Sequence, residues 1–152
     1  MKKKPTVGKD VTKLRKFYRE NRDIILSGTV LAIDPGSRSM GLSVFKCGVC
    51  VDSGTLQVDG EILPRLNKLF HQLEDMYINP DIVVVETIRA SMAHLYLQWS
   101  VGVLLAATNA PKLVEVNVNI WKKLVPLGYE KSDESDSYWI GRSLFDVGEQ
   151  KV

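Results

Sequence analysis

The stretch Val30-Leu-Ala-Ile-Asp-Pro-Gly-Ser-Arg-Ser-Met-Gly-Leu-Ser-Val44 joins two apolar runs through one tight turn. The first run is rich in aliphatic residues and ends at a carboxylate, Asp34, after which Pro35-Gly36 turns the chain at once. Short apolar runs bounded by Pro and Gly are typical of buried strands. The stretch therefore predicts two strands, at residues 29–34 and 40–46, with an acid at the end of the first.

The hydrophobic periodicity on either side of this stretch predicts the remaining elements. A helix is expected before it, and a strand, a helix, a strand, a helix, a strand and a helix are expected after it. Their expected bounds are residues 10–27, then 49–58, 62–76, 81–86, 91–107, 112–118 and 132–146. Three consecutive strands with short turns favour an antiparallel meander, and strands linked through helices run parallel. We therefore expect an α/β fold with a mixed five-stranded sheet, flanked by helices on both faces and preceded by an extra N-terminal helix.

Length and composition limit the class of protein. The chain has 152 residues, of which 45% are hydrophobic and 25% are charged, which is typical of one soluble globular domain. Its apolar runs are shorter than the ~20 residues that a membrane-spanning helix needs. Two cysteines are too few for a disulfide framework. We therefore expect a cytoplasmic protein with no membrane partner.

The charge is distributed unevenly along the chain. Residues 1–28 contain nine basic and three acidic residues, a net charge of +6, whereas the remainder contains eleven basic and fifteen acidic residues, a net charge of −4. The sequence thus predicts a basic N-terminal arm and helix at residues 1–28, followed by the main domain at residues 29–152. A basic arm of this charge would attract nucleic acid. The alternative is a solvated surface helix with an irregular N-terminal tail, which has the same composition.

Four acids fall at positions where side chains of different elements meet. Asp34 and Glu86 end two strands that we expect to be parallel neighbours, and ligands collect at this edge of an open α/β sheet. Asp133 and Asp136 lie three residues apart and share one face of the last helix. Each acid alone also has a structural explanation, because Asp is common in turns and acids stabilise the first turn of a helix.

Such a cluster requires cations. Two carboxylates 4 Å apart repel by roughly 4 kcal/mol at an effective dielectric constant of 20. Oxygen ligands with few histidines favour Mg²⁺, with Mn²⁺ as a substitute. Two such ions, roughly 3.5–4 Å apart, activate a water and stabilise the leaving oxygen in an in-line displacement at phosphorus. The pattern predicts two ions per site and phosphodiester chemistry.

Three motifs carry a family resemblance. Ile33-Asp-Pro-Gly-Ser-Arg38 with Gly41, then Val83-Val-Val-Glu86, then Lys131-x-Asp133-x-x-Asp136 resemble the RuvC-type Holliday junction resolvases of the ribonuclease H-like superfamily, and most of all their compact phage-encoded members. The resemblance implies a ribonuclease H-like fold and a homodimeric, Mg²⁺-dependent endonuclease that nicks four-way DNA junctions. It also implies that Asp34, Glu86, Asp133 and Asp136 are the catalytic, metal-binding acids.

The resemblance also suggests DNA contacts. The segment from Val118 to Lys123 occupies the place of a basic segment that faces DNA in related resolvases, which points to Lys122 and Lys123. Further candidates for phosphate contacts are Arg38, Arg89 and Lys131, although Arg38 and Arg89 can equally pair with the acids that they follow.

Three departures from the family pattern bear on the substrate. The bacterial enzymes lack the N-terminal helix and have a longer segment between Lys123 and Asp133. They also place an aromatic residue, in the loop after the second acid, against the opened junction. This chain has Thr-Ile-Arg-Ala-Ser at residues 87–91, where Arg89 or Met92 is the available substitute.

Other functions remain open at this stage. A ribonuclease H-type or flap nuclease has the same fold, and a module that binds branched nucleic acid without cutting it is a further alternative. The Asp34-Pro-Gly-Ser sequence also resembles the first phosphate loop of actin-like ATPases and sugar kinases. Those enzymes need two large domains to enclose a nucleotide, and this chain has room for one, so we expect no nucleotide cofactor. Cys47 and Cys50 favour a turn with reduced thiols over half of a zinc site shared across a dimer.

The remaining aromatic residues and histidines favour structural roles. Trp99, Trp121 and Trp139 are expected in the core rather than as base-stacking platforms, with Trp121 the best candidate for an exception because it precedes Lys122. His71 and His94 are expected to be ordinary helix residues.

Overall fold

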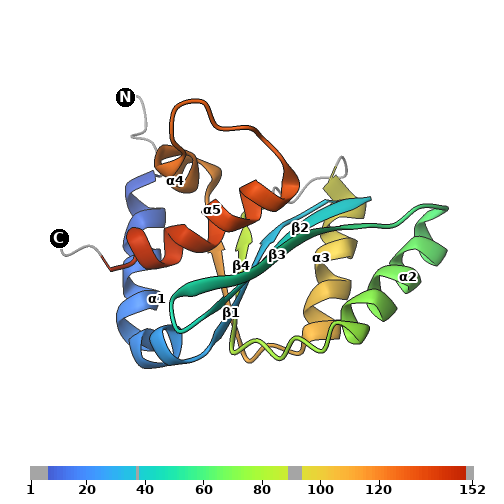
Figure 1. The fold of residues 1–152 in the computed structure, drawn as a ribbon, viewed down its shortest axis with the longest axis horizontal. Coiled ribbons are helices and arrows are strands. Elements are labelled where there is room, and N and C mark those ends of the chain that lie inside the picture. Colours follow the sequence, from blue (N-terminus) through green and yellow to red (C-terminus); the bar gives the residue numbers. More distant parts are fainter. Residues whose placement is uncertain (1–6, 37, 89–93, 150–152) are drawn as a thin grey trace.

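The computed structural model describes residues 7–36, 38–88 and 94–149, and it contains one five-stranded sheet with helices on both faces (Figure 1). The elements in chain order are α1 (Val7–Ser27), β1 (Thr29–Asp34), β2 (Ser39–Lys46), β3 (Val49–Gln57), α2 (Ile62–Asp75), β4 (Ile82–Glu86), α3 (Leu95–Thr108), β5 (Lys112–Val116), α4 (Val118–Trp121), the 3₁₀ helix η2 (Lys122–Leu124) and α5 (Asp133–Asp146). None of the described helices is long and apolar enough to span a membrane.

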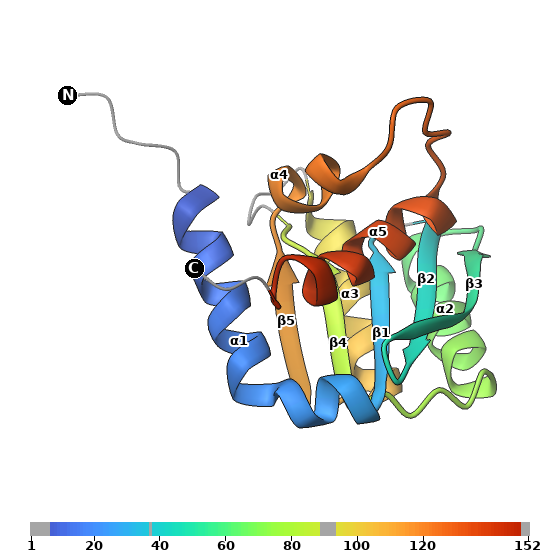
Figure 2. The ribbon, with the colours of Figure 1, turned by 60° about the vertical axis from the view of Figure 1, so that its left-hand side comes forward.

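The strand order is β3-β2-β1-β4-β5. Strands β1, β2 and β3 form the antiparallel meander, and β4 and β5 continue the sheet parallel to β1. The mixed five-stranded sheet predicted from the sequence is therefore confirmed, together with the extra N-terminal helix. Because β1, β4 and β5 all run in one direction, their carboxyl ends share one edge of the sheet (Figure 2).

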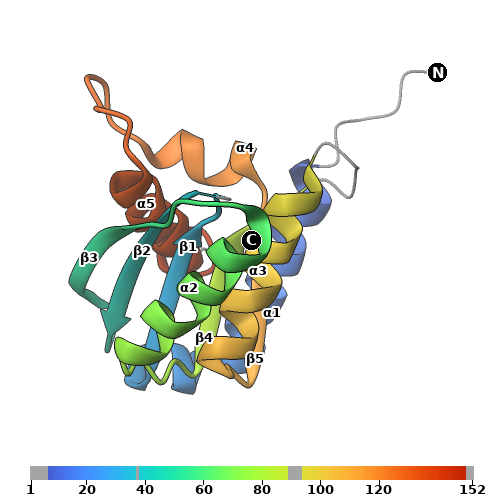
Figure 3. The ribbon, with the colours of Figure 1, turned by 90° about the vertical axis from the view of Figure 1, so that its right-hand side faces the viewer.

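The two faces of the sheet are covered by different helices. Helices α1, α4 and α5 pack on one face, and their core includes Phe45 and Ile140. Helices α2 and α3 pack on the other face over a second core that includes Leu31 and Leu104 (Figure 3). Alternate residues of β1 enter the two cores, which explains why its sequence is apolar without interruption.

Helix α1 is integrated into the first core. The side chains of Leu14, Tyr18 and Ile25 are buried there, and the helix contacts β5, α4 and α5. The helix bends at Asn21, whose amide oxygen accepts a hydrogen bond from Lys112 of β5. The division of the chain at residue 28 stays a prediction, but α1 contributes apolar side chains as well as positive charge.

The region after β5 differs from the sequence prediction. The strand expected to reach residue 118 ends at Val116, whose carbonyl oxygen accepts a hydrogen bond from the amide of Thr87 at 3.0 Å. The side chain of Asn117 then accepts a hydrogen bond from the amide of Asn119 at 3.0 Å and begins helix α4. The expectation of a strand over residues 117–118 was wrong because this local cap ends the strand.

Candidate active site

Two of the predicted acids end neighbouring parallel strands. Asp34 is the last residue of β1, and Glu86 is the last residue of β4. The register pairs Ile33 with Val85, so the two acids follow adjacent positions at the carboxyl edge of the sheet. Both strands are buried up to this point, and both acids are half-buried. The sheet therefore places two carboxylates side by side where its apolar core ends.

Helix α5 brings the other two acids to the same edge. It begins at Asp133 after a Ser132 cap, whose hydroxyl accepts a hydrogen bond from the amide of Ser135 at 3.1 Å. Its first turn lies against β2 so closely that a Cβ on Gly41 would be 1.8 Å from the carbonyl oxygen of Asp133. Gly41 is therefore required for the position of both acids, and Asp136 becomes buried, with only 3% of its surface exposed.

The acids interact strongly through space. The pKa of Asp34 is raised from 3.8 to about 8, mainly by burial and then by the negative charges of Asp136, Glu86 and Asp133. A side-chain hydrogen bond with Asp133 favours the neutral form of Asp34 further. The structure thus brings all four predicted acids into one neighbourhood. Their catalytic role stays a prediction.

Glu86 is held by residues that follow β5. The indole Nε1 of Trp121 donates a hydrogen bond to Glu86 Oε2 at 2.7 Å, and the Trp121 side chain is buried. Burial raises the pKa of Glu86, while the Trp121 hydrogen bond and the charges of Lys122 and Lys131 oppose this rise. Lys122 and Lys131 therefore lie close enough to the acids to stabilise negative charge there.

Two hydroxyl groups hold the acids of α5. The Tyr129 hydroxyl donates a hydrogen bond to Asp136 Oδ1, and the Ser39 hydroxyl donates one to Asp133 Oδ2 at 2.5 Å. Burial and the contact with Asp136 raise the pKa of Tyr129, so this phenol remains protonated. The sequence analysis missed the roles of Trp121, Tyr129 and Ser39. Ser39 lies inside the first motif and Trp121 lies in the segment that resembles a DNA-facing one, so both had a sequence signal that pointed toward the site, whereas Tyr129 had none.

The donor chemistry of this cluster suits a hard divalent cation, since it consists of carboxylate oxygens and its charges repel one another. Within residues 7–36, 38–88 and 94–149, however, no three Asp, Glu, His or Cys side chains converge as an ion-binding group. Three of the acids instead accept hydrogen bonds from Trp121, Tyr129 and Ser39. Ion binding by the four acids accordingly stays a prediction.

The predicted DNA-contacting residues lie around this edge. Lys122 and Lys123 form most of η2, and Lys131 immediately precedes the cap of α5; all three are exposed. Arg38 is exposed in the turn before β2. Arg89 lies outside the described residues, as does Met92.

Other residues that the sequence analysis singled out lie elsewhere. Cys47 lies in the turn between β2 and β3, with a positive φ of 52°, and Cys50 lies in β3; both are free thiols. His71 lies on α2 beside Glu74 at 3.6 Å, and His94 precedes α3.

The expectation that all three tryptophans are core residues was wrong for Trp99. Its side chain is 40% exposed and packs edge-on against Tyr96, with the ring centres 5.6 Å apart. Trp139 is half-buried against the first core, and Trp121 is buried but also serves the acid cluster. Trp99 reaches the surface because β-sheet contacts bury the opposite side of α3, where Val101 and Leu104 lie.

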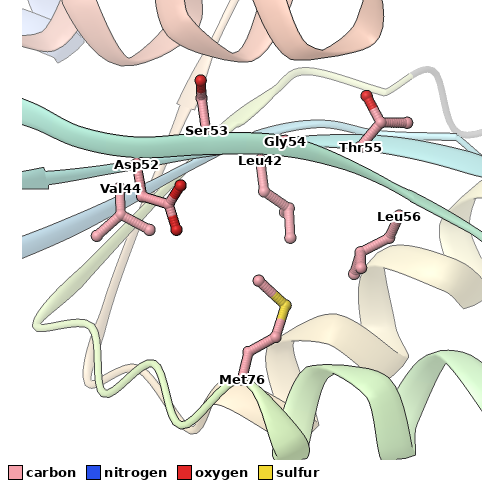
Figure 4. A pocket seen from close by; sticks show the side chains of 8 residues that line it. All are labelled: Leu42, Val44, Asp52, Ser53, Gly54, Thr55, Leu56 and Met76. Atoms are coloured by element: carbon pink, nitrogen blue, oxygen red, sulfur yellow. The ribbon is translucent and has the colours of Figure 1, made fainter.

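A separate apolar cavity of about 120 Å³ lies between the β2–β3 pair and the end of α2. Figure 4 shows Leu42, Leu56 and Met76 directed into this space. None of the four acids lines it. Its lining residues are Leu42, Val44, Asp52, Ser53, Gly54, Thr55, Leu56 and Met76. The cavity is distinct from the candidate active site.

Comparison with known proteins establishes the fold. No protein-family model matches the chain, and no curated protein matches its sequence. The structure of Thermus thermophilus RuvC in complex with a Holliday junction substrate superposes with a TM-score of 0.63 and 15% identity, over 76% of this chain and 90% of that one. A second Thermus thermophilus RuvC structure superposes with a TM-score of 0.50 and 17% identity, over 82% of this chain and 84% of that one. The chain therefore has the RuvC, ribonuclease H-like fold.

Proposed function

We propose that this protein is a divalent-cation-dependent endonuclease that hydrolyses phosphodiester bonds in four-way DNA junctions. One observation carries the proposal: at the carboxyl edge of a RuvC fold, Asp34 lies close enough to Glu86 of β4 and to Asp133 and Asp136 of α5 for their charges to raise its pKa. The comparison supports branched DNA as the substrate class, because one structure with this fold is described with a Holliday junction substrate.

Asp34, Glu86, Asp133 and Asp136 would hold Mg²⁺, with Mn²⁺ as a substitute and two ions per site. When bound, such ions activate a water and stabilise the leaving oxygen. The raised pKa of Asp34 supports this assignment, because burial and, after it, repulsion from Asp136, Glu86 and Asp133 disfavour the charged form, and a bound cation would offset both. The hydrogen bonds from Trp121, Tyr129 and Ser39 orient the other three carboxylates, as outer-shell partners of ligands commonly do.

The basic residues around the cluster would bind the DNA backbone. Lys122, Lys123, Lys131 and Arg38 are exposed near the acids, and we also propose a contact for Arg89. A phosphate approaching the four acids is repelled by them unless neighbouring cations compensate, and Lys122 and Lys131 already interact with Glu86. These residues therefore attract the strand that the acids cut.

A homodimer follows from the geometry of the proposed substrate. Resolving a four-way junction requires nicks in two strands that are related by a two-fold axis, and the described part of one chain offers one acid cluster of this kind. We therefore propose that two copies act on one junction.

The decisive experiment compares the cleavage of four labelled substrates, with and without Mg²⁺, by the wild type, Asp34→Asn and the control Asp59→Asn. The substrates are a four-way junction, a Y-fork, a flap and an RNA–DNA hybrid. We expect paired nicks in the junction from the wild type and Asp59→Asn, and none from Asp34→Asn. Equal cutting by all three proteins contradicts the assigned site. Cleavage of the hybrid or flap alone contradicts the proposed substrate. Junction binding without cleavage, or ATP hydrolysis without cleavage, contradicts the proposed activity.

A further inference from the structure

The segment at residues 125–132, which joins η2 to α5, carries an unusual apolar side chain. In Figures 1 and 2 this segment projects beyond the rest of the protein, on the side where α5 begins. Leu127 has a relative exposure of 104%, so it is as accessible as in an extended chain. A single exposed leucine is ordinary on a protein surface, so exposure alone implies no function. Its location provides the further argument.

A turn holds Leu127 within this segment. The amide of Tyr129 donates a hydrogen bond to the carbonyl oxygen of Pro126 at 3.3 Å, and Gly128 has a φ of +83°. This positive φ at the third position of the turn matches a type II turn and favours glycine there. Leu127 occupies the second position of this turn, where its side chain is fully exposed.

Residues on both sides of Leu127 are attached to the candidate active site. Trp121, just before η2, donates to Glu86, and Tyr129 donates to Asp136. The Cα atoms of residues two apart are separated by at most about 7 Å, so Leu127 is held close to Tyr129 and thus to the acids. DNA whose phosphate lies at the acids therefore passes close to Leu127.

The charges around Leu127 match the chemistry of DNA. Lys122 and Lys123 precede it and Lys131 follows it, and all three are exposed. Proteins that distort duplexes combine such phosphate contacts with an apolar wedge, often leucine, which enters between bases. Unstacking requires less energy where bases are already unpaired or poorly stacked, as at a branch point.

We infer that Leu127 is a wedge that enters the base stack beside the scissile phosphate and favours branched DNA over linear duplex. This inference rests on the proposed function and deepens it, because it names a residue that selects the substrate.

The test uses a four-way junction that carries the fluorescent base 2-aminopurine beside the crossover. The full chain carries Asp34→Asn so that it binds without cutting, and it is compared with added Leu127→Gln, Leu127→Met or Leu63→Gln. Leu63 is 71% exposed on α2 and serves as the matched control. Anisotropy of a dye at the end of one arm measures binding separately.

We expect 2-aminopurine fluorescence to rise at least twofold on binding of the parent, Leu127→Met and Leu63→Gln proteins. Leu127→Gln is expected to bind within about threefold of the parent but to produce less than half of this rise. In the cutting-competent chain, the same substitution is expected to lower the ratio of junction to duplex cleavage.

An equal fluorescence rise with Leu127→Gln and Leu63→Gln overturns the wedge and leaves the junction nuclease intact. If Leu127→Gln converts a dimer into a monomer by gel filtration, Leu127 belongs to a protein interface and the wedge is likewise wrong. Absence of junction binding by every variant overturns the proposed function and the wedge together.

Discussion

The acid cluster leads to a prediction about stability that does not depend on cleavage. Asp34→Asn keeps the size of the side chain and supplies an amide donor for the hydrogen bond with Asp133, but it removes a charge that the neighbouring acids repel. In the absence of divalent ions, we expect Asp34→Asn to be more stable than the wild type at pH 8. The substitution that we expect to abolish cleavage is thus also expected to stabilise the protein.

The magnitude follows from the pKa of Asp34, which rises from 3.8 to about 8 on folding. At 1.36 kcal/mol per pKa unit this corresponds to at most about 5–6 kcal/mol. Asp34 is only half-buried, so water screens part of the effect, and we expect about 2 kcal/mol. For a chain of 152 residues, this raises the melting temperature by about 4–8 °C.

The pH dependence has a defined sign. The unfolded chain releases the Asp34 proton from about pH 4 upward, and the folded protein releases it only near pH 8. The stability of the wild type therefore falls across this window relative to Asp34→Asn. The difference between the two proteins opens from near zero at pH 4 to its full size at pH 8.

The assay is thermal unfolding in EDTA between pH 4 and pH 8.5, followed by a Mg²⁺ titration at pH 8. Mg²⁺ at ten times its dissociation constant stabilises the wild type by about 1.4 kcal/mol and Asp34→Asn by much less. The exposed acid Asp59, replaced by Asn, is the control and is expected to respond like the wild type. If Asp34→Asn is destabilised at pH 8, or the difference does not vary with pH, then Asp34 does not experience the repulsion described above.

Three further predictions concern the residues that hold the site and attract the substrate. Gly41→Ala is expected to lose about 3 kcal/mol of unfolding free energy and all cleavage, because the added Cβ would collide with the backbone of α5. Gly54→Ala is the control, since its Cβ would have no neighbour within 4 Å, and it is expected to keep both stability and cleavage. Denaturant titrations measure the stability, and nicking assays measure the cleavage. Trp121→Phe removes the hydrogen-bond donor to Glu86 but keeps an aromatic ring. The half-saturating Mg²⁺ concentration, measured by calorimetry, is expected to rise about tenfold. An unchanged concentration would show that this hydrogen bond does not orient Glu86. Lys13 is exposed on α1. Lys13→Gln is expected to reduce the slope of log DNA affinity against log salt concentration by up to about 0.9. An unchanged slope would exclude a phosphate contact by Lys13.

Much of the fold could be predicted because strands and turns leave local signals. The apolar runs that end at Asp34 and Glu86 identified two strands and their ends, and a short Pro-Gly turn required the antiparallel hairpin. The prediction failed at Val118, where a side-chain cap from Asn117 begins a helix in a segment with strand-like composition. It also failed for Trp99, because the exposure of an apolar helix residue depends on which face packs against the sheet.

The sequence by itself determined the order of the strands and of the long helices, since each of these elements depends on residues close together in the chain, and it predicted the four candidate acids at the ends of those elements. Only the tertiary structure decided which donors hold those acids, how closely α5 approaches Gly41, and that α1 packs into the core. Trp121 and Glu86 are 35 residues apart, and Ser39 and Asp133 are 94 apart. Contacts over such separations arise from the packing of whole helices against the sheet, and no local pattern of residues encodes them.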